Sequence, residues 1–299
     1  MLKTLFKKAL RKGAFFVSVI FTISIFLSIA PANAENCISQ KLSPPERVSV
    51  KWVYDGDSLL LTDKRKIRII GIDTPETKHH KQKAQAYGAK AREVLRVLLK
   101  NNNYQVVLRY GKERKDKYGR TLAHVYLTNG INVSNWLLEQ GYAKTLAYPP
   151  NVQLAKCYKK SEEIAQSQSL KIWRYKSNKV RNAASLPRRI SGYVRLEGKV
   201  SNIKHYRKSL IMELESDRKT HIQVKIKKRN LKYFNKMTPE KLWNKTIIVT
   251  GILKNKKGRR TLYVSHPTQI YVASAKLSNK LKSLETLKKS SDIKWSLQK

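Results

Sequence analysis

The stretch RIIGIDTPE, residues 68–76, decides how this 299-residue chain is interpreted. Its apolar, β-branched residues predict a strand that ends in the carboxylate of Asp73. Two further charged runs belong with it, Asp55-Gly56-Asp57 and DKYGR at 116–120. Together the three runs supply hard oxygen ligands, a further carboxylate and two guanidinium groups. That set suits metal-assisted cleavage of a phosphodiester, in which a protein positions water and neutralises phosphate charge.

The carboxylates predict a site for a hard cation, because no His or Cys accompanies them. Asp57 follows a tight Asp-Gly turn, and Asp73 ends a strand. With the carbonyl of Thr74 and with water, they would form the loose oxygen shell that suits calcium better than magnesium. An isolated Asp-Gly-Asp is usually an ordinary turn, so the prediction depends on the whole combination.

Glu76 and two arginines complete the predicted site. Glu76 lies three residues beyond Asp73, where its carboxylate could hold an attacking water. Arg68 and Arg120 are fork-shaped donors for phosphate oxygens, although an isolated arginine is more often a surface charge. Alternation along a regular strand places Arg68 and Asp73 on different faces. Gly71 would permit a bend between them.

Residues 46–173 predict one small α+β barrel module. Short β-rich runs separated by turn residues predict strands at 46–54, 58–62, 66–72, 104–110 and 119–127. Apolar residues at helical spacing predict helices at 85–100, 133–140 and 152–168.

Residues 174–299 predict a second, smaller unit. The aperiodic, positively charged segment 174–190 is interpreted as a basic linker, followed by a small β-barrel at 191–273. Its predicted strands are 193–202, 209–214, 220–226, 245–253 and 261–264. A helix-like insert at 228–242 would make this barrel OB-like, with a generic β-barrel as the alternative. The tail 274–299 fits a basic amphipathic helix, or a docked or frayed terminal helix.

The first 34 residues predict export. A basic start precedes the uncharged apolar run 14–30, and Pro31-Ala32-Asn33-Ala34 offers a cleavage site that would leave a mature start at Glu35. The run is also long enough to remain as an N-terminal anchor. We therefore expect a secreted or periplasmic protein, cleaved or anchored through 14–30.

The charge of the chain predicts a polyanionic partner. The formal net charge is +43; residues 174–299 hold 33 basic and seven acidic side chains, and residues 35–173 hold 25 and 13. DNA and RNA are the leading partners, an anionic membrane or cell-wall polymer is the alternative, and no protein partner is inferred. Aromatic residues in the second unit could stack on bases or fill the barrel core: Tyr193, Tyr206, Tyr233, Trp243 and Tyr263.

The two cysteines, Cys37 and Cys157, are compatible with a single disulfide in an oxidising compartment. Two unrelated free thiols are the alternative. Two cysteines and scattered histidines do not favour a zinc site.

The order and spacing of these motifs resemble the thermonuclease (staphylococcal nuclease-like) family. The likeness covers about 46–173 and includes IDTPETKH, DKYGR, the EQGYAK run at 139–144 and the closing IW at 172–173. The resemblance implies an OB-type five-stranded barrel with three helices. It also implies a calcium-dependent endonuclease that hydrolyses DNA and RNA and leaves 3′-phosphate ends.

The resemblance also implies roles for individual residues of this chain. The metal ligands would be Asp57, Asp73 and the Thr74 carbonyl, and Glu76 would be the water-orienting group or general base. Arg68 and Arg120 would be the two phosphate clamps. The substrate contacts would be Lys117, Tyr118 and Tyr148.

Two departures from the family pattern stand out. Ser58 replaces the usual threonine of the Asp-Gly-Asp-Thr run and keeps a hydroxyl. Of the family's two pocket tyrosines only Tyr148 is present, and it matches with a one-residue deletion, so the resemblance is weaker at the base-stacking position than at the carboxylates and arginines. The alternative function is a catalytically silent nucleic-acid-binding or cell-surface polyanion-binding protein. The chain retains every predicted carboxylate and arginine, which favours an enzyme.

Overall fold

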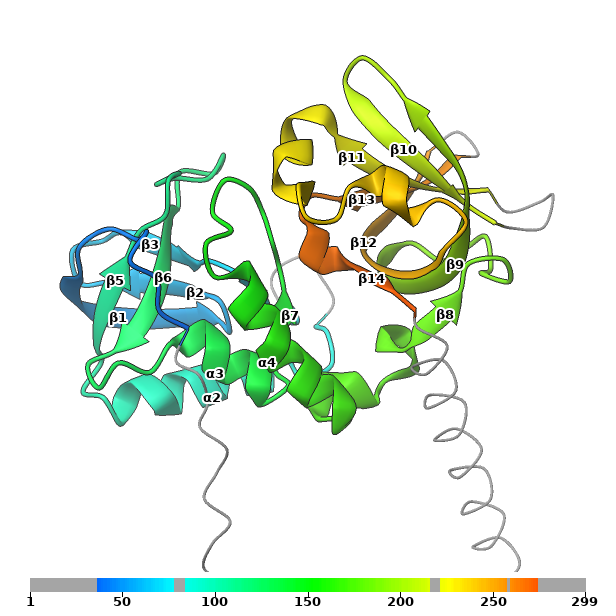
Figure 1. Cartoon of the computed structure of the whole chain (residues 1–299). Coiled ribbons are helices and arrows are strands. Elements are labelled where there is room, and N and C mark those ends of the chain that lie inside the picture. Colours follow the sequence, from blue (N-terminus) through cyan, green and yellow to red (C-terminus); the bar gives the residue numbers. More distant parts are fainter. Residues whose placement is uncertain (1–36, 78–83, 216–220, 257–258, 274–299) are drawn as a thin grey trace, which may run out of the picture. The chain divides into compact units, whose positions relative to one another are not determined.

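A computed structural model describes residues 37–77, 84–215, 221–256 and 259–273 (Figure 1). The predicted leader at 1–34 and the predicted tail at 274–299 lie outside the described residues. Within the part that is described, the helices are too short or too polar to cross a membrane.

The first barrel is closed by five strands in the order β1-β2-β3-β6-β5. Their bounds are β1 (Glu46–Asp55), β2 (Ser58–Leu61), β3 (Lys66–Ile69), β5 (Gln105–Arg109) and β6 (Thr121–Leu127). Strand β1 pairs with two strands: residues 46–49 pair with β5, and residues 50–55 pair with β2. Strands β3 and β6 run parallel and close the barrel. This topology confirms the predicted OB-type barrel.

Helices α2 (Gly88–Lys100), α3 (Val133–Glu139) and α4 (Ala155–Ser167) accompany this barrel. Helix α2 buries Ala91, Leu95 and Leu99 in the barrel core, as its apolar spacing predicts. The side chain of Asn132 caps α3 by accepting a hydrogen bond from the backbone N–H of Asn135. Each helix lies within three residues of its predicted bounds.

A bend at Gly71 divides the strand predicted at 66–72. Strand β3 ends at Ile69, and a separate short strand β4 (Ile72–Asp73) pairs with β7 (Lys144–Thr145). Gly71 has a φ of +91°, and a Cβ built there would lie 2.2 Å from the ring of Tyr158. Only glycine fits both the conformation and the close approach. The bend is what lets residues on either side of it meet.

The second barrel repeats the topology of the first. Its strands are β9 (Gly192–His205), β10 (Ser209–Leu214), β11 (Ile222–Lys227), β12 (Thr246–Lys256) and β13 (Arg259–Val264). Strand β9 pairs with β12 along its first half and with β10 along its second half, and β11 runs parallel to β13. The predicted insert is present as two 3₁₀ helices, η3 (Lys228–Phe234) and η4 (Pro239–Leu242).

Part of the segment predicted as a linker belongs to the second barrel. After the 3₁₀ turns η1 (Lys171–Arg174) and η2 (Lys176–Asn178), strand β8 (Val180–Asn182) pairs in parallel with β9. Ala183 and Leu186 are buried in the second core. A strand of three residues has too little sequence to show a period, so the pattern alone could not reveal it. Turn η5 (Pro267–Gln269) and edge strand β14 (Ile270–Val272) end this barrel.

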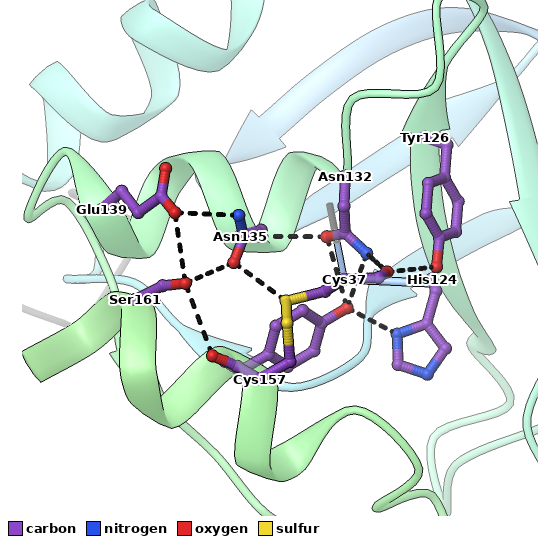
Figure 2. The surroundings of a disulfide bond; sticks show 9 residues. Cys37, His124, Tyr126, Asn132, Asn135, Glu139, Cys157 and Ser161 are labelled. Carbon is purple, nitrogen blue, oxygen red and sulfur yellow. Dashed lines mark hydrogen bonds between the residues drawn. A yellow bond between two sulfur atoms is a disulfide. The ribbon is translucent and has the colours of Figure 1, made fainter. Parts of the chain in front are cut away.

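A disulfide joins Cys37, ahead of β1, to Cys157 on α4, with the two Cα atoms 5.7 Å apart (Figure 2). It lies among buried polar groups of α3, α4 and β6. The backbone carbonyl of Cys37 accepts hydrogen bonds from Tyr126 Oη at 2.9 Å and from Asn132 Nδ2 at 3.1 Å. Tyr158 Oη in turn lies 2.8 Å from Nδ1 of His124. The disulfide therefore fixes the start of the module onto the helix that carries Tyr158.

We expect loss of this disulfide to destabilise the first barrel strongly. The bond closes a loop between cysteines 120 positions apart, so it restricts a large part of the unfolded chain. The double substitution Cys37→Ser/Cys157→Ser should lower the free energy of unfolding, measured in urea, by about 2–4 kcal/mol. Dithiothreitol should destabilise the wild type similarly and leave the variant unchanged. Equal stability of variant and wild type would contradict this expectation.

Candidate active site

The site is organised around Arg68, whose guanidinium lies between two carboxylates. Its Nη1 is 2.9 Å from Asp57 Oδ1, and its Nη2 is 3.3 Å from Asp73 Oδ1. Nη1 also donates to the backbone carbonyls of Ile69 and Ile72, on the two sides of the Gly71 bend. The sequence left open whether Arg68 and Asp73 could meet. The bend brings them together.

Asp57 is held rigidly at the turn between β1 and β2. Its backbone N–H donates to Asp55 Oδ1 at 2.9 Å, which forms the tight turn expected from the sequence. Its Oδ2 accepts hydrogen bonds from both the backbone N–H and the hydroxyl of Thr74, at 2.9 and 3.0 Å. A Cβ at Gly56 would lie 2.7 Å from the Thr74 side chain. Glycine thus allows the turn to pack against the end of β4.

The surroundings of Asp57 and Asp73 raise the pKa values of both carboxyl groups. Burial raises the pKa of Asp57 to about 6, and the charge of Arg68 opposes that rise. Partial burial and the nearby Asp57 charge likewise raise the pKa of Asp73. Two carboxylates that share one region of low polarity repel each other unless a positive charge lies between them.

The donor set fits a hard divalent cation. One guanidinium reaches an oxygen of Asp57 and an oxygen of Asp73, so the two oxygens converge on a common region. Thr74, whose carbonyl was predicted as the third ligand, adjoins both. The described residues contain no cluster of three or more His, Cys, Asp or Glu side chains. A site here would therefore need backbone carbonyl and water oxygens, as calcium sites commonly use.

Glu76 lies two residues after Thr74, the last of the predicted metal ligands, and its backbone is held by hydrogen bonds. Its N–H donates to the Gln85 side chain at 3.3 Å, and its carbonyl accepts from the Gln85 N–H at 2.9 Å. A Cβ at Gly88 would lie 2.2 Å from the Glu76 carbonyl oxygen, so the first residue of α2 packs tightly against this segment. The predicted role of Glu76 in orienting water remains a prediction.

Arg120 is oriented by Asp116 within the DKYGR turn. Asp116 Oδ2 accepts from Arg120 Nε at 2.8 Å, and Oδ1 accepts from the backbone N–H groups of Tyr118 and Arg120. Burial by itself would raise the pKa of Asp116, but these hydrogen bonds outweigh burial and lower that pKa. Arg120 directly precedes β6, which pairs with the strand that carries Arg68. The two predicted phosphate clamps thus come from β3 and from the residue just before the neighbouring strand β6.

The predicted substrate contacts lie on two loops that are tied together. Tyr118 is 72% exposed, and Tyr148 is 62% exposed. Lys117 Nζ lies 4.7 Å from the centre of the Tyr118 ring, and interactions first with Tyr118 and then with Tyr148 raise its pKa. The Asn151 side chain bonds both the N–H and the carbonyl of Glu113, which joins the two loops. Lys117, Tyr118 and Tyr148 therefore form one neighbourhood.

Lys144 was not assigned a role from the sequence, although it ends the EQGYAK run. The pairing of β4 with β7 places it directly opposite Asp73. The N–H of the next residue, Thr145, donates to Glu162 Oε1 at 2.8 Å, which anchors β7 to α4. A strand of two residues leaves no periodic signal, so only its pairing reveals that Lys144 lies beside the site.

Comparison with known proteins identifies the family of the first barrel. Residues 66–175 match the family model described as staphylococcal nuclease homologue. A thermonuclease of Staphylococcus intermedius is 39% identical over 133 residues, which cover 43% of this chain and 76% of the relative. This chain belongs to the staphylococcal nuclease family. As a member it is a nuclease-type hydrolase.

Two proteins of Bacillus subtilis strain 168 are further relatives of this nuclease. Endonuclease YncB is 32% identical over 154 residues, covering 48% of this chain and 72% of the relative. The SPbeta prophage-derived endonuclease YokF is 36% identical over 130 residues, covering 42% of this chain and 43% of the relative. The family match ends near the close of the first barrel, so the second barrel is interpreted from its own residues.

We expect Asp116→Ala to impair this nuclease by releasing Arg120. The substitution removes the acceptor of two backbone N–H groups and of Arg120 Nε, so the clamp loses its fixed orientation. Misplacement of a positioned group by about 1 Å can cost roughly 10²-fold in rate, so we expect a loss of about tenfold or more in kcat/KM.

The chain offers a matched control in Asp63. Asp63 bonds the backbone N–H of Arg65 at 3.0 Å and Arg65 Nε at 2.8 Å, in the turn between β2 and β3. Asp63→Ala should leave kcat/KM near the wild-type value. Equal effects of the two substitutions would show that Asp116 matters only for general stability.

Proposed function

We propose that this protein is an exported, calcium-dependent endonuclease that hydrolyses DNA and RNA, with a basic second barrel that helps to hold the nucleic acid. The observation that carries the proposal is the convergence of Asp57 and Asp73 on Arg68 at the end of β3, next to the strand that follows Arg120. Membership of the staphylococcal nuclease family supports it.

The residues of the site would divide the work of phosphodiester hydrolysis. Arg68 and Arg120 would bind the phosphate oxygens and stabilise the charge that grows on them in the transition state. Glu76 would hold the attacking water and take its proton. Lys117, Tyr118 and Tyr148 would position the adjoining nucleotide. The expected products carry 3′-phosphate ends.

Asp57, Asp73 and the Thr74 carbonyl would hold the calcium ion. When bound, the ion supplies positive charge beside the scissile phosphate. Asp57 is only 5% exposed, and both of its oxygens are engaged. Thr74 donates two hydrogen bonds to Oδ2, whereas Ser58 Oγ and Arg68 Nη1 lie 3.1 and 2.9 Å from Oδ1, so a cation at Oδ1 would share that oxygen with Arg68. Calcium is favoured over magnesium because two carboxylates and a carbonyl make an irregular set, whereas magnesium demands near-octahedral geometry.

The disulfide supports the export that the first 34 residues predict. Disulfides persist in oxidising environments and are rare where thiols are kept reduced. The bond between Cys37 and Cys157 begins three residues after the predicted leader. The proposed location is therefore outside the cytoplasmic membrane, secreted or periplasmic, with or without an N-terminal anchor.

A silent nucleic-acid-binding protein is the competing function. It would retain the fold and the positive charge but lack cleavage. Every predicted carboxylate and arginine is present, and Asp57, Arg68 and Asp73 meet in the structure, so the enzyme is the better-supported function.

The direct test uses the mature chain, 35–299, on heat-denatured DNA and on RNA. Both substrates should be cleaved in calcium, cleavage should stop in EDTA, and excess calcium should restore it. A folded protein that shows no cleavage above the EDTA control would refute the enzyme. Equal rates in magnesium would refute the assigned cation.

Glu76→Gln should lower the cleavage rate by about 10²-fold or more at saturating calcium, because the amide can orient water but cannot accept its proton. Single-turnover rates across a calcium titration separate this effect from weaker metal binding. Glu93→Gln, on the exposed side of α2 where Glu93 pairs with Arg96, is the matched control and should cleave normally. A full rate for Glu76→Gln in saturating calcium would remove Glu76 from the mechanism.

A further inference from the structure

The outward-facing side chains of the second barrel form a regular row across its strands. The register pairs Lys204 with Ile211, Ile211 with Lys225, Lys225 with Tyr263 and Tyr263 with Ile252. We call these five residues the outer row. It crosses β9, β10, β11, β13 and β12. Its first four members alternate between lysine and an apolar or aromatic side chain, and Ile252 follows Tyr263.

Side chains alternate along a strand, and the chain neighbours of the row residues point into the barrel. The row itself therefore faces outward. These inward neighbours are at most 1% exposed: Leu210, Met212, Val224, Leu253 and Leu262. In contrast, Tyr263 is 39% exposed and Ile252 is 43% exposed. The sequence left open whether Tyr263 was core or surface, and the register assigns it to the surface.

Cations surround the exposed ring of Tyr263. Lys225 is its register partner on β11, so the two lie one strand spacing, about 5 Å, apart. Lys254, two positions from Ile252 on β12, places its Nζ 5.8 Å from the ring centre. A second aromatic ring, Tyr206, is 52% exposed at the turn two positions beyond Lys204.

The charge of the barrel favours a polyanion on this face. Residues 191–273 hold 20 lysines and arginines against five carboxylates. Next to the outer row lies a second row of Asn202, Glu213, Gln223, Thr261 and Lys254. Its carboxylate, Glu213, accepts from Lys204 Nζ at 3.0 Å, which holds that cation on the face.

We propose that the outer row binds single-stranded nucleic acid, with a base stacked on Tyr263 and phosphates at Lys225 and Lys204. Exposed aromatic rings beside cations are the means by which proteins hold single strands without reading their sequence. A paired duplex hides its bases within its own stack, so Tyr263 selects unpaired bases. This inference rests on the proposed function, because it gives the second barrel a share in holding the same substrate.

Binding of labelled oligothymidylate to the mature chain in EDTA, where cleavage is suppressed, tests the stacking role. Tyr263→Ala should raise Kd by about fivefold or more, and Tyr263→Phe should retain wild-type affinity. The control is Trp243→Ala, because Trp243 is 61% exposed but lies outside the row. Unchanged affinity in Tyr263→Ala, or an equal loss in Trp243→Ala, would overturn the proposal.

The phosphate role has its own measurement. Lys225→Gln should reduce the slope of log Kd against log salt by about 0.7, the value for one phosphate contact on a single strand. Lys245→Gln removes an exposed lysine outside the row and should leave the slope unchanged. Equal slopes for wild type and Lys225→Gln would overturn the phosphate contact.

Two further measurements distinguish this proposal from membrane binding and from the proposed nuclease function. Loss of phosphatidylglycerol vesicle binding in Tyr263→Ala, with oligothymidylate binding intact, would overturn it in favour of a membrane surface. Cleavage in calcium is scored separately. A chain that never cleaves but loses affinity in Tyr263→Ala would refute the nuclease and support the outer row. A chain that cleaves, and whose outer-row variants bind oligothymidylate normally, would support the nuclease and refute the outer row. Thermal unfolding of each variant confirms that it is folded.

Discussion

The interaction on which the site depends is the bridge that Arg68 makes between Asp57 and Asp73. A carboxylate that is 5% exposed is unfavourable without a compensating charge, and breaking such a buried pair commonly costs about 3–5 kcal/mol. The bridge exists only because the chain bends at Gly71. The ring of Tyr158, on α4 next to the disulfide-bonded Cys157, packs directly against this bend. The geometry of the candidate site and the packing of α4 are therefore linked through Gly71.

The two barrels share a topology and differ in chemistry. In each, a long first strand pairs with two neighbours, and the third strand runs parallel to the fifth. The first barrel gathers carboxylates and arginines at the end of its third strand. The second has Lys225 at the centre of its third strand, with an exposed tyrosine beside it. Under the proposed function, the same fold would support two kinds of phosphate recognition, because function follows from the residues placed on it.

Polar side chains support the first barrel at its helical side. Asn132 caps α3, donates to the carbonyl of Cys37 and contacts Tyr158 Oη at 3.1 Å, so one amide joins the cap, the disulfide and the bend (Figure 2). The hydrogen bonds of this network strengthen one another, although the buried Nε2 of His124 has no hydrogen-bond partner among the described residues. Here the network holds Cys37, α3 and α4 together.

The sequence by itself determined the motifs, most strands and helices, the cysteine pair and the excess of positive charge, because these depend on residues close together in the chain. It could not show that Arg68 meets Asp73, since strand alternation argued against it and only the left-handed conformation of Gly71 reverses that result. Nor could it place Lys144 opposite Asp73, find β8 or decide which aromatic residues face solvent. Those features depend on register between strands distant in sequence, and register is set by the packing of the whole barrel.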